Sequence, residues 1–195
     1  MVVIDATTLL LMLRPGTPVP GGPNGLPPVD RAKERIEYLV QRLDKAKTKI
    51  IIPAPALSEV LIRAGADGSV QIIERLQRYA VFSIEPFDTR ASIEVAAMSR
   101  EALAKGNKRG QSEATWAKVK YDRQIVAIAK VHGATAIHSD DGDIDTLCKR
   151  AKITMVRLAE LPLPPQTAQL AMLLEQVPDA GQSSGDEGAE EQPQA

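Results

Sequence analysis

Short apolar runs alternate with stretches of helical periodicity along most of the chain. The apolar runs predict buried strands at residues 1–4, 49–52, 80–84, 134–137 and 153–156. The stretches between them predict helices after Asp5, Asp30 and Pro53, and at residues 69–78, 88–105, 120–132 and 141–150. Because parallel strands need crossover connections, which are usually helices, this order predicts a three-layer α/β/α fold with a central parallel sheet.

Polar residues mark several of the predicted boundaries. Asp30 and Asp88 each precede a helical stretch, and an aspartate in that position predicts an N-cap. The helix after Asp30 presents one apolar stripe, formed by Ile36, Leu39, Val40 and Leu43. Residues 14–29, which are rich in proline and glycine, and the polar residues 106–117 predict loops.

Composition divides the chain into three parts. The alternating pattern predicts one domain at residues 1–160, and an amphipathic stretch predicts a helix at 161–177. Residues 178–195 have five acidic side chains and no basic ones, so we expect a flexible acidic tail. The rest of the chain has 24 basic residues against 20 acidic ones, an excess that suits contact with a polyanion.

Three features of the composition exclude classes of protein. Cys148 is the single cysteine, which excludes an internal disulfide and a multi-cysteine zinc site, and suits a reducing compartment. Aromatic residues are 3% of the chain, which argues against a surface that stacks RNA bases on rows of aromatic rings. Because no apolar stretch is long enough to span a bilayer, we expect a cytoplasmic protein without membrane contact.

Carboxylates follow two of the predicted strands. Asp5 comes directly after the first strand, and Asp140, Asp141 and Asp143 come after the fourth. Ligands of α/β proteins bind beyond the carboxyl ends of parallel strands, so these acids stand where a site would form. Plain structural roles stay open, because Asp5 could cap the next helix and the second group could form an ordinary polar turn.

Two further carboxylates lie in predicted helices. Asp122 shares a helical face with Ile125 and Val126, and a carboxylate on a buried face is unfavourable unless a cation or hydrogen-bond donors accompany it. Alternatively, it is a first-turn acid that the helix dipole favours. Glu59 could face solvent and pair with Arg63, four residues further on.

One shared cation accounts for these carboxylates more simply than four separate structural roles. Magnesium prefers carboxylate and water oxygens, and such ions can activate a water molecule and stabilise the leaving oxygen when a phosphodiester is hydrolysed. The acids therefore predict metal-dependent phosphodiester hydrolysis.

Four short motifs, in this order, resemble those of the PIN-domain family. They are VVID ending at Asp5, PALSE ending at Glu59, YDRQIVAIAKVHGA containing Asp122, and Ser-x-Asp-x-Asp at residues 139–143. The resemblance covers residues 1–156 and implies a PIN-like α/β/α fold. It also implies a VapC-like ribonuclease that depends on Mg²⁺ or Mn²⁺, with an antitoxin protein as its partner.

Roles for individual residues follow from the same resemblance. It implies four catalytic acids, which are Asp5, Glu59, Asp122 and Asp141. It implies four metal ligands, which are Asp5, Asp122, Asp141 and Asp143. Ser139 matches a residue that positions the site, and Thr7 could orient a ligand or a phosphate oxygen, so we expect both near the substrate.

Basic residues gather before and beside Asp122. They are Lys105, Lys108, Arg109, Lys118, Lys120 and Arg123. We expect Lys118, Lys120 and Arg123 to bind RNA, and Trp116 could stack on a base. An ordinary solvated loop, with Trp116 anchoring it to the core, is the alternative. A homodimer, and a PIN-like scaffold that binds RNA or protein without cutting, also stay open.

Overall fold

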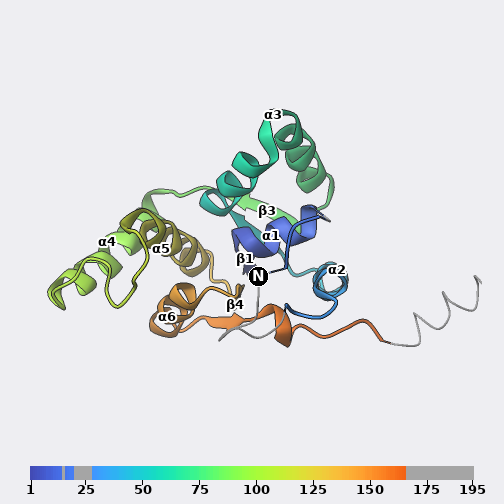
Figure 1. The fold of residues 1–195 in the computed structure, drawn as a ribbon. Coiled ribbons are helices and arrows are strands. Elements are labelled where there is room, and N and C mark those ends of the chain that lie inside the picture. The colour runs from blue at the N-terminus through green and yellow to red at the C-terminus, as the bar shows by residue number, and fades with distance from the viewer. Residues whose placement is uncertain (15, 20–27, 166–195) are drawn as a thin grey trace, which may run out of the picture. The chain divides into compact units, whose positions relative to one another are not determined.

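A parallel sheet lies at the centre of the fold in this computed structural model, which describes residues 1–14, 16–19 and 28–165. Over these residues the sheet has five strands in the order β3-β2-β1-β4-β5 (Figure 1). The strands are β1 (Val2–Ile4), β2 (Ile50–Pro53), β3 (Phe82–Glu85), β4 (Ala136–His138) and β5 (Thr154–Val156). All five predicted strands are therefore present.

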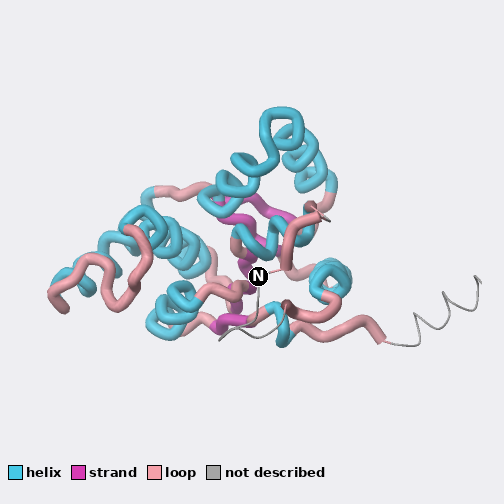
Figure 2. The backbone as a smooth tube through the Cα atoms, in the orientation of Figure 1, coloured by secondary structure: helices cyan, strands magenta, loops and turns pink. Residues whose placement is uncertain are grey.

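Helices cover both faces of the sheet. They are α1 (Ala6–Leu13), α2 (Ala32–Lys45), α3 (Ala54–Arg78), α4 (Thr89–Ala104), α5 (Trp116–Val131) and α6 (Gly142–Ala151), followed by the short 3-10 helix η2 (Leu158–Glu160). Helix α1 packs with α2, α5 packs with α4 and α6, and α3 contacts both α1 and α5 (Figure 1 and Figure 2). The predicted three-layer α/β/α fold with a central parallel sheet is confirmed.

The strand order creates a switch point between β1 and β4. The chain runs outward from β1 through β2 to β3, and then returns to the other side of β1 as β4. Val3 consequently lies opposite Ile51 of β2 on one side and Ile137 of β4 on the other. Ligands of parallel sheets bind beyond the carboxyl ends of the strands at such a point. The residues that follow β1 and β4 therefore occupy the favoured place for a site.

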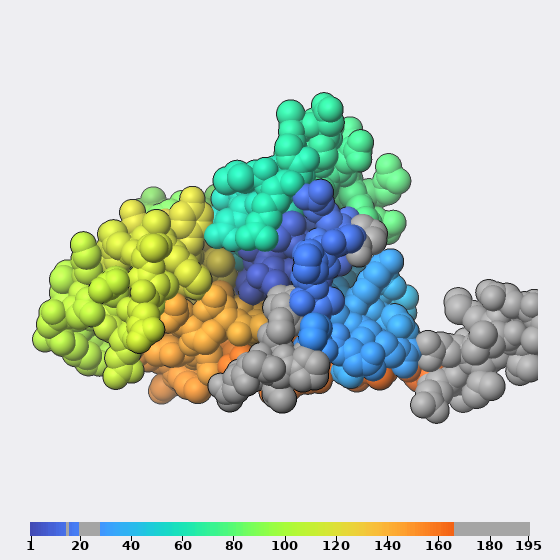
Figure 3. All heavy atoms as spheres, in the orientation of Figure 1, coloured from blue at the N-terminus to red at the C-terminus, as the bar shows by residue number. Residues whose placement is uncertain are grey.

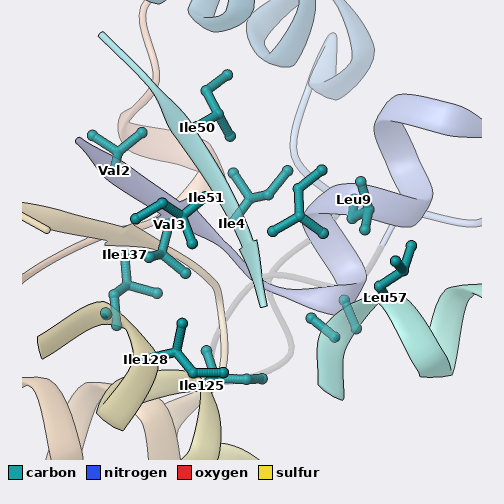
Figure 4. Close-up of a cluster of buried hydrophobic side chains, with 14 of the residues drawn as sticks. Val2, Val3, Ile4, Leu9, Ile50, Ile51, Leu57, Ile125, Ile128 and Ile137 are labelled. Carbon is teal, nitrogen blue, oxygen red and sulfur yellow. The ribbon is translucent and has the colours of Figure 1, made fainter. Parts of the chain in front are cut away.

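Burial on both faces explains why the inner strands are uninterrupted apolar runs. Val3, Ile51 and Ile137 are fully buried in one aliphatic core. Figure 4 shows these side chains close to Leu9 of α1 and Ile128 of α5, so the sheet is packed between its helix layers. A smaller apolar cluster joins α2 to η2.

Ile51 offers a test of this core. Replacing the fully buried Ile51 with alanine should lower the free energy of unfolding by about 3 kcal/mol, because it leaves a cavity between the helix layers. Ile62→Ala is the matched control, since this side chain is 79% exposed and its loss should change stability by less than about 0.5 kcal/mol. Urea unfolding measures both variants, and equal losses would contradict the core assignment.

The start of α2 differs from the prediction. Asp30 does not cap this helix: the N-cap residue is Arg31, whose φ of 51° is left-handed and whose side chain makes no capping hydrogen bond. Arg31 instead forms a salt bridge with Glu34 in the first turn. Asp88, in contrast, caps α4 as predicted and accepts a hydrogen bond from the Ala91 N–H (2.9 Å).

Helix α5 begins four residues earlier than predicted. Thr115 caps it by accepting a hydrogen bond from the Lys118 N–H (3.3 Å), so Trp116 belongs to the helix and not to the predicted loop, and Lys118 lies in the first turn. Asp122 then lies in the second turn, and its interpretation as a first-turn acid is wrong. Lys118 and Asp122 become neighbours on one face of the helix, four residues apart.

Helix α3 combines the two helices predicted after Pro53 and at residues 69–78. Its backbone breaks at Gly65, whose φ of 73° lies in the region that glycine adopts without a steric penalty. The first half, which carries Glu59, therefore runs in a different direction from the second (Figure 1).

Several predictions concern residues outside those that the structure describes. The loop at 14–29 lies partly outside them, the helix at 161–177 mostly, and the acidic tail at 178–195 wholly. These features, and the domain limits based on them, stay predictions. Within the described part of the chain, no helix combines the length and the apolar character needed to cross a membrane.

Candidate metal centre

The carboxylates that follow β1 and β4 lie next to each other. Ile4 pairs with His138 at the ends of the two strands, and the Asp5 N–H donates to the His138 carbonyl (3.2 Å). Asp5 also caps α1, because its Oδ1 accepts a hydrogen bond from the Thr8 N–H (2.8 Å). The capping role of Asp5 is therefore correct, but it occupies only one oxygen of a carboxylate that is 5% exposed.

Ser139 links Asp5 to Asp141. Its hydroxyl donates to Asp5 Oδ2 (2.6 Å) and accepts from the Asp141 N–H (3.1 Å). Asp141 in turn caps α6, since its Oδ1 accepts from the Asp143 N–H (2.7 Å). Ser139 is buried and orients the two acids, and its predicted contact with substrate stays a prediction.

Asp122, Asp141 and Asp143 form a tight group, called the acidic cluster below. One oxygen of each lies within 4.8 Å of the others. The Lys118 ammonium lies among them, 2.9 Å from Asp122 Oδ2, 2.6 Å from Asp141 Oδ2 and 3.7 Å from Asp143 Oδ2. Ser112 also holds Asp143 by donating its hydroxyl to Oδ2 (2.8 Å). A positive charge thus already sits against all three carboxylates.

Burial perturbs the ionisation of the acids. It raises the pKa of Asp122 to about 6, although the hydrogen bond from Lys118 opposes this effect. Burial also raises the pKa of Asp5, against the hydrogen bond from Ser139. For Asp141 burial is again the largest single effect and raises the pKa, but the hydrogen bond and charge of Lys118 and the N–H groups of Asp143 and Ile144 together outweigh it, so the pKa is lowered. Buried carboxylates of this kind are stabilised when a cation binds.

Asp5 and Glu59 line the same pocket as Asp122 and Asp141. Thr7 and Lys118 also border it, at the carboxyl ends of the strands. Glu59 extends from the first half of α3 and is half-buried. Among the described residues it forms no salt bridge with Arg63, so the interpretation of Glu59 as one half of a surface ion pair is wrong. The structure therefore brings the four predicted catalytic acids to one pocket, and Asp122 and Asp141 lie there in direct proximity to Asp143.

The donor set suits a hard divalent cation. Carboxylate oxygens without a histidine or cysteine ligand match Mg²⁺ or Mn²⁺ and not zinc. The Lys118 ammonium, held by two carboxylates at 2.6 and 2.9 Å, is an internal stand-in for a cation at this place. Within the described part of the chain, no other group of three such ligands comes together.

Comparison with known families agrees with this geometry. The model of the PIN domain matches residues 29–150, which is more than half of the chain. The chain belongs to the PIN domain family. The matched segment contains Glu59 and the acidic cluster, whereas Asp5 precedes it and joins the site through β1 and Ser139. The predicted PIN resemblance is confirmed, and PIN domains are nucleases.

Two solved VapBC complexes share the fold of this PIN domain. For VapBC2 from Rickettsia felis, solved bound to a DNA fragment from its promoter, the TM-score is 0.52 at 12% identity, over 80% of this chain and 98% of that chain. For DNA-bound VapBC from Salmonella typhimurium, the TM-score is 0.50 at 14% identity, over 80% and 97%. At such low identities, the likeness shows a shared fold and nothing more. A search of the curated proteins found no match.

The predicted RNA-binding residues of the PIN domain differ in exposure. Arg123 is 2% exposed, and its guanidinium donates to Ser99 Oγ (3.0 Å) and the Lys108 carbonyl (2.7 Å). It anchors the loop before α5 from inside the fold and not from an exposed surface, and its predicted contact with RNA stays a prediction. Lys120 and Thr7 are exposed and stay candidates.

Trp116 is surrounded by cations. Lys108, Lys120 and Arg123 lie 5.3, 5.9 and 5.4 Å from the centre of its ring. Cations held over an aromatic face attract its electrons and fix its position. These contacts favour an anchoring role for Trp116 over a free surface for stacking bases.

Some roles were missed by the sequence reasoning. Asp140 Oδ1 accepts a hydrogen bond from the Leu158 N–H (3.1 Å), so this acid belongs to the turn beside η2 and not to the acidic cluster. Lys118 was expected to touch RNA, but here it pairs with the cluster. The signal for that pairing is the spacing of four between Lys118 and Asp122, visible once α5 is known to start at Trp116.

Proposed function

We propose that the protein is a ribonuclease that hydrolyses RNA phosphodiester bonds with Mg²⁺ or Mn²⁺. The observation that carries the proposal is the gathering of Asp122, Asp141 and Asp143 beside Asp5 at the switch point of the sheet. Membership of a nuclease family supports a role for this acidic group in metal-dependent phosphodiester hydrolysis.

Each acid receives a role in the proposal. Asp5, Asp122, Asp141 and Asp143 hold the ion, and Glu59 acts partly through water from the wall of the pocket. Ser139 and the N-terminus of α6 keep Asp5 and Asp141 aligned before any ion binds. This alignment limits the reorganisation needed at binding, which is how a supporting shell raises metal affinity.

The ion supplies the chemistry that side chains of this pocket lack, because it lowers the pKa of a water molecule and stabilises the charge on the phosphate. Thr7 borders the pocket and is exposed, so its hydroxyl orients a phosphate oxygen. Lys118 and Lys120 draw the RNA backbone toward the acids. An ion held by Asp122 and Asp141 would take the place of the Lys118 ammonium, which would then be free to contact the phosphate.

Cleavage of a mixed-sequence RNA ladder tests this function. Purified protein should cut the ladder in Mg²⁺ or Mn²⁺, and EDTA should abolish cutting because the carboxylates alone cannot activate water. Intact RNA in every metal, with RNA binding retained, would favour the catalytically inactive scaffold instead.

We further propose that the protein acts as the toxin of a toxin–antitoxin pair. The likeness to the VapBC complexes spans nearly the whole of the matched chains, 98% and 97%, which supports an antitoxin as partner. A homodimer belongs to the same proposal.

A further inference from the structure

A second pocket lies next to the acidic cluster, between the loop before α5 and helix α6. It is lined by Arg109, Ser112, Asp122, Arg123, Asp143 and Arg150, and is called the arginine pocket below. Figure 3 shows the yellow-green surface of α4, α5 and their loop adjoining the orange surface of α6, which brings residues from distant parts of the sequence together. Asp122 and Asp143 border this pocket as well as belonging to the cluster.

Three guanidinium groups border this pocket without a carboxylate at salt-bridge distance, although the charge on Arg150 helps to lower the pKa of Glu101. Within the described residues, Arg109, Arg123 and Arg150 form no salt bridge within 4 Å. Arg123 is 2% exposed, and its Nε is buried without any hydrogen-bond partner. Burial lowers the pKa of Arg123, and the nearby charge on Arg150 lowers it further. A buried donor and neighbouring like charges are unfavourable unless an acceptor or an anion accompanies them.

The two acids that border the arginine pocket do not neutralise it. Asp122 is held by Lys118 (2.9 Å), and Asp143 accepts from Ser112 (2.8 Å) and lies 3.7 Å from Lys118. Their charge is thus already balanced in part within the acidic cluster. The arginine pocket keeps a positive surplus beside a site that favours cations.

We propose that the arginine pocket binds a phosphate group of the RNA strand, next to the phosphate that is cut. This inference rests on the proposed function. Arginine presents several N–H donors in a planar fork that matches phosphate oxygens, and three such side chains line this pocket. The pocket is about 60 Å³ in volume, which is enough for a small anion. It has no aromatic lining residue on which a base could stack.

Binding of RNA in EDTA tests the inference, because no metal-dependent cutting occurs there. Arg150→Gln should weaken the binding of a fluorescein-labelled mixed-sequence RNA about threefold to tenfold. The slope of log affinity against log salt concentration should fall by about one, because about one counterion fewer is released on binding. Lys149→Gln is the matched control: it removes the same charge one position earlier on α6, but this ammonium pairs with Asp145 (3.0 Å) and does not border the pocket. Fluorescence anisotropy over a salt series measures both variants.

Arg109→Gln repeats the test from the other wall of the pocket and should behave like Arg150→Gln. Melting temperatures of all three variants show whether each is folded. If Arg150→Gln and Arg109→Gln bind RNA no more weakly than Lys149→Gln, the arginine pocket does not hold a phosphate, whether or not the wild-type protein cuts RNA. If they bind more weakly but the wild-type protein cuts nothing in Mg²⁺ or Mn²⁺, the pocket is supported and the proposed catalysis fails.

Discussion

Asp122→Asn should lower kcat for RNA cleavage by a factor of about 10³ or more. The change keeps the shape of the side chain but removes one negative ligand from the acidic cluster, and a catalytic ion supplies several kcal/mol of transition-state stabilisation. Single-turnover cleavage of a defined RNA in saturating Mn²⁺ measures the loss, and saturation separates weaker metal binding from slower chemistry.

The folded state should tolerate this substitution. Burial raises the pKa of Asp122 to about 6, above that of an unfolded chain, so the stability that its protonated form contributes is present below about pH 4 and lost as the pH rises through 6. At pH 7 an uncharged asparagine therefore adds no penalty from burial of charge. A melting temperature near that of wild type would show that lost activity is not lost structure.

Asp140→Asn is the matched control for Asp122→Asn. Asp140 stands in the same acidic run as Asp141, but its Oδ1 accepts from the Leu158 N–H, a bond that the asparagine oxygen can keep. Cleavage should stay within a few-fold of wild type. Equal, large losses for both variants would mean that general negative charge, and not the acidic cluster, sustains activity.

Lys118→Met should bind Mn²⁺ about tenfold more tightly than wild type and cut RNA at least about tenfold more slowly. Tighter binding follows because the ion no longer has to displace an ammonium that pairs with Asp122 and Asp141 at 2.9 and 2.6 Å. Slower cutting follows because the released ammonium no longer contacts the phosphate. Calorimetric titration with Mn²⁺ and single-turnover cleavage measure the two effects separately.

Lys120→Met provides the comparison for the metal titration. This ammonium lies 5.9 Å from the centre of the Trp116 ring and pairs with no carboxylate of the acidic cluster, so Mn²⁺ affinity should not change. Should Lys118→Met bind Mn²⁺ no better than Lys120→Met, the ammonium and the ion do not compete for one place.

The fold was largely predictable because its strands are buried on both faces. Uninterrupted apolar runs such as the one containing Ile51 are typical of strands covered on both sides, and the helices between them require parallel pairing. Capping was less predictable: Asp88 caps α4, but Asp30 does not cap α2, where Arg31 adopts a left-handed conformation and pairs with Glu34. A favourable cap residue is only a local preference for where a helix begins, and a nearby ion pair can stabilise a different start.

The candidate site was predictable where strands end and less so where helices begin. Asp5 and Asp141 follow adjacent strands, so the sheet alone brings them together. The sequence predicts a helix that begins only at Lys120, because Thr115 was not recognised as the cap of α5, and the pairing of Lys118 with Asp122 was missed for that reason. Arg123 follows Asp122 directly, and no pattern in the neighbouring sequence predicts that its guanidinium points into the fold and binds Ser99.

The central claim is that these carboxylates share one divalent ion, and anomalous scattering from a crystal soaked in Mn²⁺ tests it most directly. The account predicts a manganese peak in contact with oxygens of Asp122 and Asp141, on the side facing Asp5, with the Lys118 ammonium moved away. A map in which Lys118 keeps both salt bridges and no manganese lies among the carboxylates would contradict it.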